Sequence, residues 1–131
     1  MKKYLWASIH KPIKVQLEQL KGNIIYLKDN LSLYNKMINN DPDADLKELA
    51  LELLTYAKEL SVDYIVQPSG SPAFQLCLGV ELGIDMGTGY EYYSSIGILY
   101  AYSVRVSEDI TQEDGTVKKV SIFKHEKFIE C

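Results

Sequence analysis

Basic residues, cysteines and long apolar runs are all scarce in this chain of 131 residues. Its two cysteines lie in an apolar segment and at the last position, so neither a disulfide framework nor a metal site is indicated. No run approaches the roughly 18 to 20 apolar residues of a membrane span, and the first apolar stretch stops at His10, which suits a strand better than a signal peptide. These absences predict a single cytoplasmic domain over residues 1–131 with no membrane contact.

The shortage of basic residues is uneven along the chain. The formal net charge is −4, and the segment 62–116 holds eight acidic residues against one base, Arg105. The tail from Val117 holds the lysines Lys118, Lys119, Lys124 and Lys127. A domain that binds long nucleic-acid duplexes usually has a basic face, so this class of partner is not expected. A small anionic ligand held by the tail remains an open alternative.

Residues 63–84 predict a buried strand, a polar turn and an apolar helix. Gly70 ends the strand, while Ser71 followed by Pro72 marks a helix start, because serine caps the first amides and proline suits the first helical position. The amides of Gly70, Ser71 and Ala73, with the helix dipole, would favour a phosphate beyond the strand's carboxyl end. A capped helix without any ligand explains the same residues equally well.

The rest of the chain predicts an alternation of strands and helices. Strands are expected at 4–9, 23–28 and 64–66, with helices opening at Pro12, over 45–60 and at Ser71, while 30–38 fits a short helix or an ordered loop. After Gly83 we expect a loop over 85–95, whose tyrosines could stack on a nucleobase or cover the core. Strands over 96–106 and 117–123, joined by an Asp-Gly turn, complete the pattern. The sequence thus predicts an α/β, Rossmann-like three-layer fold with a mainly parallel sheet and a C-terminal β-hairpin.

Two groups of polar residues are expected at one edge of this sheet. Ser8 and His10 follow the first strand, and Ser69, Gly70 and Ser71 follow the third. Parallel strands bring their carboxyl ends to a common edge, so the two groups should lie close together. A histidine there could exchange a proton near neutral pH, and Lys11 would attract phosphate. A surface histidine packed over a loop is at least as good an interpretation.

His125 is the second candidate for proton transfer, since the apolar anchors Phe123 and Phe128 pin the basic segment around it. The alternative is a solvated edge strand whose lysines discourage aggregation. Motifs for metal ligation, for a serine nucleophile elbow, for a Walker loop and for dinucleotide binding are all missing from the sequence. We therefore expect no metal and no cofactor, and either recognition or metal-free rearrangement of a phosphorylated ligand.

The tail carries a family resemblance. Ala101-Tyr-Ser-Val-Arg-Val followed by Asp114-Gly-Thr-Val-Lys-Lys-Val-Ser-Ile-Phe-Lys-His-Glu-Lys-Phe-Ile-Glu resembles the C-terminal signature of a family of small CRISPR-associated proteins of type III systems, and Ser8-Ile9-His10 resembles their opening. The family consists of Rossmann-like, CARF-like ring nucleases that linearise cyclic oligoadenylate messengers and so end an antiviral response. The resemblance implies a homodimer that binds cyclic tetra-adenylate across its two-fold axis.

The resemblance also implies a mechanism and a set of residues. A ribose 2′-hydroxyl attacks the adjacent phosphodiester without a metal, so the protein aligns atoms and stabilises charge. Phosphate binding falls to the turn amides of 69–71, to Arg105 and to Lys119 or Lys124, and proton transfer falls to His10 or His125. The stretch 85–95 is longer than the family pattern, which leaves ring size open. A binder that does not cut, acting as sensor or sponge, and an interaction domain whose hairpin forms a dimer remain as alternatives.

Overall fold

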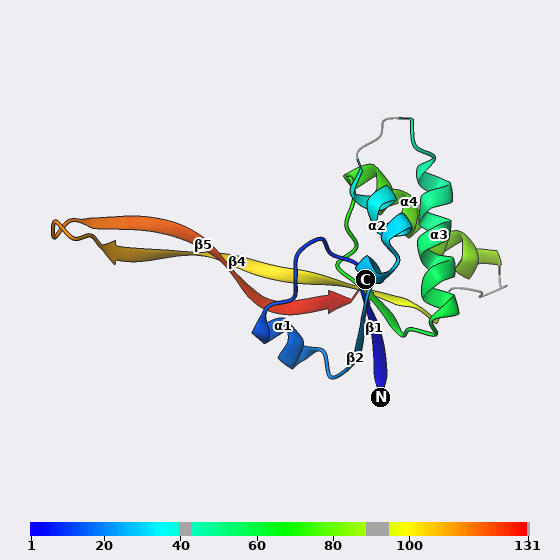
Figure 1. Ribbon diagram of the computed structural model, residues 1–131, viewed down its shortest axis with the longest axis horizontal. Coiled ribbons are helices and arrows are strands. Elements are labelled where there is room, and N and C mark those ends of the chain that lie inside the picture. Colours follow the sequence, from blue (N-terminus) through cyan, green and yellow to red (C-terminus); the bar gives the residue numbers. More distant parts are fainter. Residues whose placement is uncertain (40–42, 89–94, 131) are drawn as a thin grey trace.

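The computed structural model describes residues 1–39, 43–88 and 95–130, with the backbone alone described for 85–88. A single five-stranded sheet forms its centre, with the strand order β2-β1-β3-β4-β5 (Figure 1). The elements in chain order are β1 (Lys2–Trp6), α1 (Lys14–Gln19), β2 (Gly22–Tyr26), the 3₁₀-helix η1 (Leu27–Asp29), α2 (Leu31–Ile38), α3 (Leu46–Glu59), β3 (Tyr64–Val66), α4 (Pro72–Thr88), β4 (Gly97–Thr111) and β5 (Val117–Glu130).

The sheet is parallel except at one edge. β1 pairs in parallel with β2 and with β3, β3 pairs in parallel with β4, and β4 and β5 form an antiparallel pair. Helices connect the parallel neighbours, as such crossovers require. The expected α/β class, with a mostly parallel sheet and a C-terminal antiparallel pair, is confirmed. No helix in the described part of the chain is long and apolar enough to cross a membrane.

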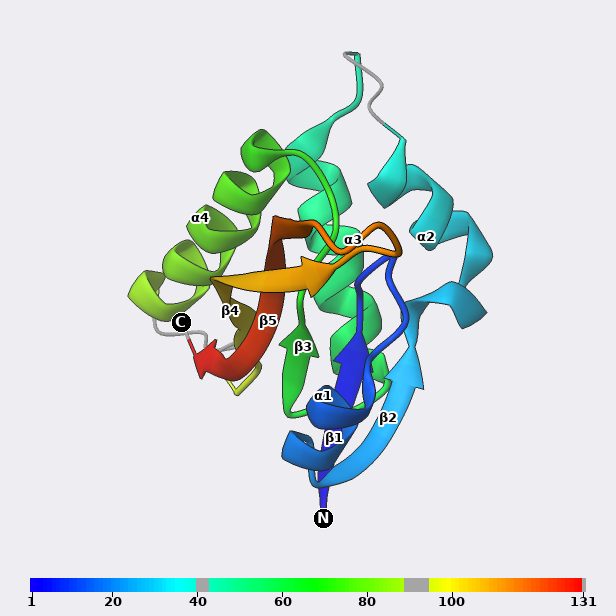
Figure 2. The ribbon, with the colours of Figure 1, turned by 90° about the vertical axis from the view of Figure 1, so that its left-hand side faces the viewer.

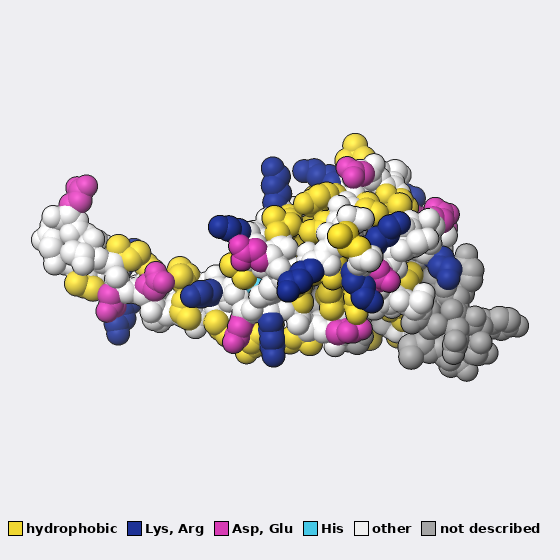
Figure 3. Space-filling model, turned by 90° about the horizontal axis from the view of Figure 1, so that it is seen from below, with side chains coloured by type: hydrophobic (Ala, Val, Ile, Leu, Met, Phe, Trp, Pro, Cys, Tyr) yellow, Lys and Arg dark blue, Asp and Glu magenta, His cyan; other side chains and the backbone are white. Residues whose placement is uncertain are grey.

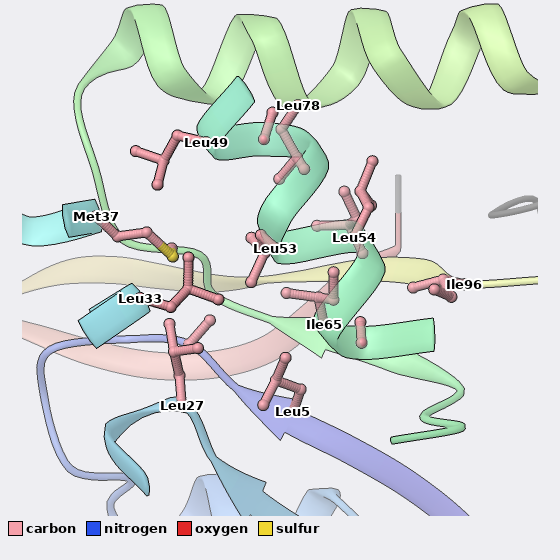
Figure 4. Packing of buried hydrophobic residues seen from close by; sticks show 14 of the residues in the cluster. Leu5, Leu27, Leu33, Met37, Leu49, Leu53, Leu54, Ile65, Leu78 and Ile96 are labelled. Atoms are coloured by element: carbon pink, nitrogen blue, oxygen red, sulfur yellow. The ribbon is translucent and has the colours of Figure 1, made fainter. Parts of the chain in front are cut away.

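The two faces of the sheet are covered unequally. α2, α3 and α4 pack on one face, where a cluster around Leu5, Leu53, Ile65 and Leu78 is fully buried (Figures 2 and 4). On the other face lies the six-residue helix α1, which has no buried residue of its own, and Leu20, directly after it, joins a small cluster that contains Trp6 and Val66. The hydrophobic contribution to stability therefore comes mainly from the α3 side.

Most predicted helix starts are confirmed by their caps. Asp45 Oδ1 accepts a hydrogen bond from Glu48 N at 3.1 Å, and Ser71 Oγ accepts one from Phe74 N at 3.2 Å. The open choice at 30–38 resolves as the helix α2, whose cap is Asn30.

The expected loop from 85 onward is wrong for 85–88, because α4 continues to Thr88. A glycine inside a helix costs only about 1 kcal/mol relative to alanine, so Gly83 does not end this mainly apolar helix. The tyrosines at 90, 92 and 93 lie outside the described residues.

The β4–β5 pair is much longer than predicted. The expected strand limits, 106 and 123, are extended to Thr111 and Glu130. Beyond a register irregularity between Tyr102 and Ser103, residues 103–124 leave the body as a two-stranded ribbon, here called the arm (Figure 1). The Asp-Gly turn at its tip is confirmed by a φ of 86° at Gly115.

Candidate functional site

The turns after β1 and β3 lie against each other at the carboxyl edge of the sheet. Ser69 N donates to Ala7 O at 3.0 Å, and Ser69 Oγ accepts from Ile9 N at 2.8 Å. The chain leaves β1 toward β2, whereas β3 lies on the opposite side of β1, so the connections diverge at this point. The structure therefore brings the predicted groups at Ser8 and Ser69 together. Ser69 holds the two turns in place through both its amide and its hydroxyl.

A hollow of about 370 Å³ opens beside this junction, at the ends of β1 and β2. We call it the β1-end pocket. Its apolar lining comes from the larger side chains Trp6, Leu17 and Tyr26, together with Ile9 and Pro12, and its polar lining comes from Ser8, His10, Lys11, Lys28 and Asp29. Three predicted residues, Ser8, His10 and Lys11, thus share one pocket.

Local hydrogen bonds fix the loop that carries His10. The indole Nε1 of Trp6 donates to His10 O at 2.7 Å, and Ser8 Oγ accepts from His10 N at 3.1 Å. At the start of α1, Gln16 Oε1 accepts from Ile13 N at 3.0 Å. The backbone around His10 is therefore held on both sides while its side chain stays exposed. That combination suits a group that meets a ligand.

The pocket combines apolar and cationic surfaces. Lys11 and Lys28 provide two positive charges against the single carboxylate of Asp29, and Trp6 and Tyr26 provide aromatic surface. Such a lining fits a ligand with a flat apolar part and a phosphate, since aromatic rings stack on bases and lysines bind phosphate. Lys28, Trp6 and Tyr26 were not among the predicted site residues. The signal was available, because the end of β2 lies beside that of β1 in a parallel sheet.

The predicted turn at Gly70 and Ser71 opens onto a different hollow, of about 610 Å³. Gly70 has a φ of 134°, and a Cβ there would lie 2.7 Å from Phe74 Cδ1, so the turn requires glycine. Among the described residues that line this hollow there is no lysine, arginine or histidine. The turn therefore meets mainly apolar side chains, and its link to the β1-end pocket is Ser69.

A glutamine network behind this turn was not predicted. Gln67 has a φ of 51°, and its backbone N donates to Leu99 O at 2.7 Å. Its side-chain Oε1 accepts a hydrogen bond from Ala101 N at 2.7 Å. Gln75 accepts from the Tyr100 hydroxyl at 2.7 Å and donates to Pro68 O at 2.6 Å. The network ties the end of β3 to β4 and α4. Its sequence signal is weak, since it consists of two polar residues in apolar surroundings.

His125 packs against α1 and is absent from the lining of the β1-end pocket. Its Nε2 lies 2.8 Å from Gln19 Oε1, and its Nδ1 lies 3.5 Å from Gln16 Nε2. This pair of contacts selects the neutral ring with its proton on Nε2, and burial lowers the pKa of His125. The ring also lies 4.9 Å from that of Phe128. His125 thus joins β5 to α1 as a neutral group.

The other predicted basic residues lie on the arm. Arg105 stands over the ring of Phe123 at 5.0 Å, Lys119 pairs in register with Asp109, and Lys124 pairs with Val104. Positive and negative side chains alternate with apolar ones along the arm (Figure 3). Because the arm points away from the body, a single chain does not bring these three cations to the β1-end pocket.

Comparison with known proteins identifies a family. The model of the Uncharacterized protein MJ1673 family matches residues 2–129, so the chain belongs to that family. No curated protein and no solved structure matches the chain. The matched range runs from β1 to β5 and includes both the β1-end pocket and the arm.

Proposed function

We propose that the protein binds a cyclic oligoadenylate, with cyclic tetra-adenylate as the first candidate, and linearises it without a metal or a cofactor. The observation that carries this proposal is the β1-end pocket, where His10, Lys11 and Lys28 line a hollow with aromatic walls. A ligand made of adenines and phosphodiesters matches both parts of that lining. The tail resemblance to ring nucleases of type III CRISPR systems supports the same ligand class.

The chemistry needs few protein groups. The 2′-oxygen of one ribose attacks the adjacent phosphorus, the bond to the 5′-oxygen breaks, and the products are a 2′,3′-cyclic phosphate and a 5′-hydroxyl. Lys11 and Lys28 would stabilise the extra negative charge on the phosphorane oxygens, and the imidazole of His10 would donate a proton to the leaving 5′-oxygen. Water accepts the proton of the attacking hydroxyl. His10 takes this role because His125 is engaged as a neutral contact on α1.

The finer description of the fold belongs to the same proposal. Apart from the antiparallel β5, the order β2-β1-β3-β4-β5 with a divergence between β1 and β3 resembles that of a doubly wound sheet, in which ligands bind at this divergence. This order supports a Rossmann-like, CARF-like domain in a cytoplasmic homodimer. Arg105, Lys119 and Lys124 would then reach a ligand only from the second copy.

A second candidate is a sensor or sponge that binds the ring without cutting it. His10 lines the pocket, whereas His125 is held by two glutamines. Only one of the two predicted histidines is therefore placed to transfer a proton, which favours binding without cleavage. The two candidates share the pocket and differ in the role of His10.

One assay separates these functions. Purified protein is incubated with labelled cyclic tri-, tetra- and hexa-adenylate in EDTA, and binding is measured by calorimetry. The nuclease predicts linear products, a loss of cleavage of about 100-fold or more in His10→Ala with binding retained, and roughly 10-fold weaker binding in Lys11→Ala. Gln112→Ala at the arm tip is the matched control. Binding with intact ligand would establish the sponge, and absence of both binding and cleavage would refute the proposal.

A further inference from the structure

Two apolar surfaces are left uncovered by the residues that the structure describes, 1–39, 43–88 and 95–130. The first is one face of the arm, formed by residues that alternate along both strands and pair across them. We call it the arm's apolar face, and it consists of Val104, Val106, Ile110, Val120 and Ile122. Ile110 is 48% exposed and Ile122 is 38% exposed, and Glu108, Lys118 and Lys124 share this face.

The arm's apolar face continues the face that α4 covers in the body. Ile98, an even-numbered residue of β4, is buried in the main core, and Tyr100 bonds to Gln75 of α4. Alternation along β4 puts Val104 and Val106 on this same side. The sheet thus extends beyond its helix layer with apolar residues still on the same side, although Glu108, Lys118 and Lys124 interrupt them. An apolar sheet face is normally covered by a helix or a second sheet.

The second surface is the outer side of α4. Phe74 and Leu78 point into the core, whereas Leu76 is 70% exposed, Val80 is 49% exposed and Ile84 is exposed at the same four-residue spacing. We call these three residues the α4 stripe. A helix with apolar residues on two opposite sides is normally packed against other elements on both of those sides.

These two surfaces do not meet within one chain, since the arm leads away from the helices (Figures 1 and 2). We infer that two copies exchange arms, so that the arm's apolar face of each copy covers the α4 stripe of the other. Within the body, α4 lies on the same side of the sheet as the arm's apolar face. Consider a two-fold axis that lies in the helix layer and is perpendicular to the strands. Rotation about this axis places α4 of one copy on the arm of the other, and the same contact forms a second time with the two copies interchanged. Such an isologous pair is closed and satisfies both surfaces at once.

Stability and charge favour this occupant. A two-stranded ribbon by itself is marginal in water, and packing against a helix is one of the ways in which it becomes stable. Glu81 is the one charged residue of α4 within 72–84, and Lys118 and Lys124 lie on the arm's apolar face. With Glu108 on the same face, the arm keeps a surplus of one positive charge there, which is complementary to the single negative charge of the helix. The inference does not depend on the proposed ligand.

The mass of the wild-type protein and of paired variants, measured by light scattering and sedimentation, tests this inference. Wild type is expected to be a dimer. Ile122→Asp and Val80→Asp should each weaken the dimer by about 100-fold or more, because a carboxylate would replace an apolar side chain in the contact and lose its hydration there. Ser121→Asp, on the opposite face of the arm, and Lys47→Asp, on the surface of α3, are the matched controls and should stay dimeric. A monomeric wild type, or a dimer that tolerates Ile122→Asp, would overturn the inference.

Crosslinking provides an answer even if a charged variant fails to fold. In a background with Cys77→Ala and Cys131→Ser, a Val80→Cys chain is mixed with an Ile122→Cys chain and oxidised. Arm exchange predicts a disulfide between the two different chains. A disulfide confined to two Ile122→Cys chains would show that arms pack on each other, and no disulfide in any mixture would show a monomer or another interface. Either result contradicts arm exchange.

Discussion

The body and the arm share the same two strands, yet the two regions differ in what surrounds them. In the body, Ile98 of β4 is buried under α4, while Ile110 of the same strand is half exposed in the arm. Apolar residues of β4 lie on the same side in both places, although Glu108 interrupts them in the arm. An apolar strand pattern therefore predicts that a sheet face is packed against another element. The helices of the chain determine how much of that face is buried within one copy.

Removal of a core side chain should separate the two regions most clearly. Leu53→Ala leaves a cavity in a fully buried site of the body, so the free energy of unfolding should fall by about 2–5 kcal/mol. Val106→Ala in the arm should change the free energy of unfolding by less than about 0.5 kcal/mol. Both substitutions are made in the Ile122→Asp variant, so that the dimer contact does not contribute to the comparison. Urea unfolding followed by circular dichroism measures both, and equal losses would show that the arm shares the core of the body.

A backbone substitution at the β3–α4 turn should have the next largest effect. Gly70→Ala places a Cβ in a positive-φ conformation against Phe74, at an expected cost of about 1–3 kcal/mol. Gly79→Ala is the matched control, because nothing lies within 4 Å of its added Cβ, and it should gain up to about 1 kcal/mol from helix propensity. If thermal melts gave both variants the same shift, the turn would not be constrained as described.

Acidification should loosen the contact where the arm joins the body. The fold lowers the pKa of His125, so the unfolded chain binds more protons between the ordinary pKa near 6.5 and the lower folded value. The contribution of His125 to the free energy of unfolding is therefore fully present above pH 6.5. It is lost as the pH falls through this window. The ring is only partly buried, so this effect should be smaller than that of either substitution above.

Urea midpoints at pH 7.5 and pH 5.5 measure the effect of acidification. His125→Gln should remove the part of the difference that belongs to this residue. A wild type and a variant with the same pH dependence would contradict the role given to His125.

The smallest effect is expected within the arm itself. Arg105 over the Phe123 ring contributes about 0.5–1 kcal/mol as an exposed cation–π pair. A double-mutant cycle with Arg105→Ala and Phe123→Leu measures this coupling in urea. The pair Lys119 and Asp109, which are opposite in register, serves as the comparison and should couple no more strongly. No coupling at Arg105 would mean that the ribbon is not formed in solution.

Local signals predicted most of the body. Asp45 and Ser71 cap their helices as the sequence indicates, and the meeting of the turns at Ser8 and Ser69 follows from parallel pairing alone. The short helix α1 was less predictable. Of its expected apolar positions Leu20 is buried, whereas Ile13 and Leu17 are exposed, because so short a helix covers little of the sheet.

Features that depend on distant contacts could not be predicted. The partners of His125 are Gln16 and Gln19, more than 100 positions earlier in the chain, so its titratable ring looked available for catalysis. Lys28 was not predicted because it follows β2, whereas the polar groups expected at this edge follow β1 and β3. The length of the arm was missed because polar and charged residues interrupt its alternation.

Amide hydrogen exchange as a function of protein concentration tests most directly whether the arm's apolar face is buried by a second copy of the chain. Amides of β1 and β3 should be protected at every concentration. Amides between 104 and 122 should gain protection as dimers form and lose it in Ile122→Asp, while the body remains unchanged. Equal protection of the arm in dilute monomer and in concentrated protein would contradict this account.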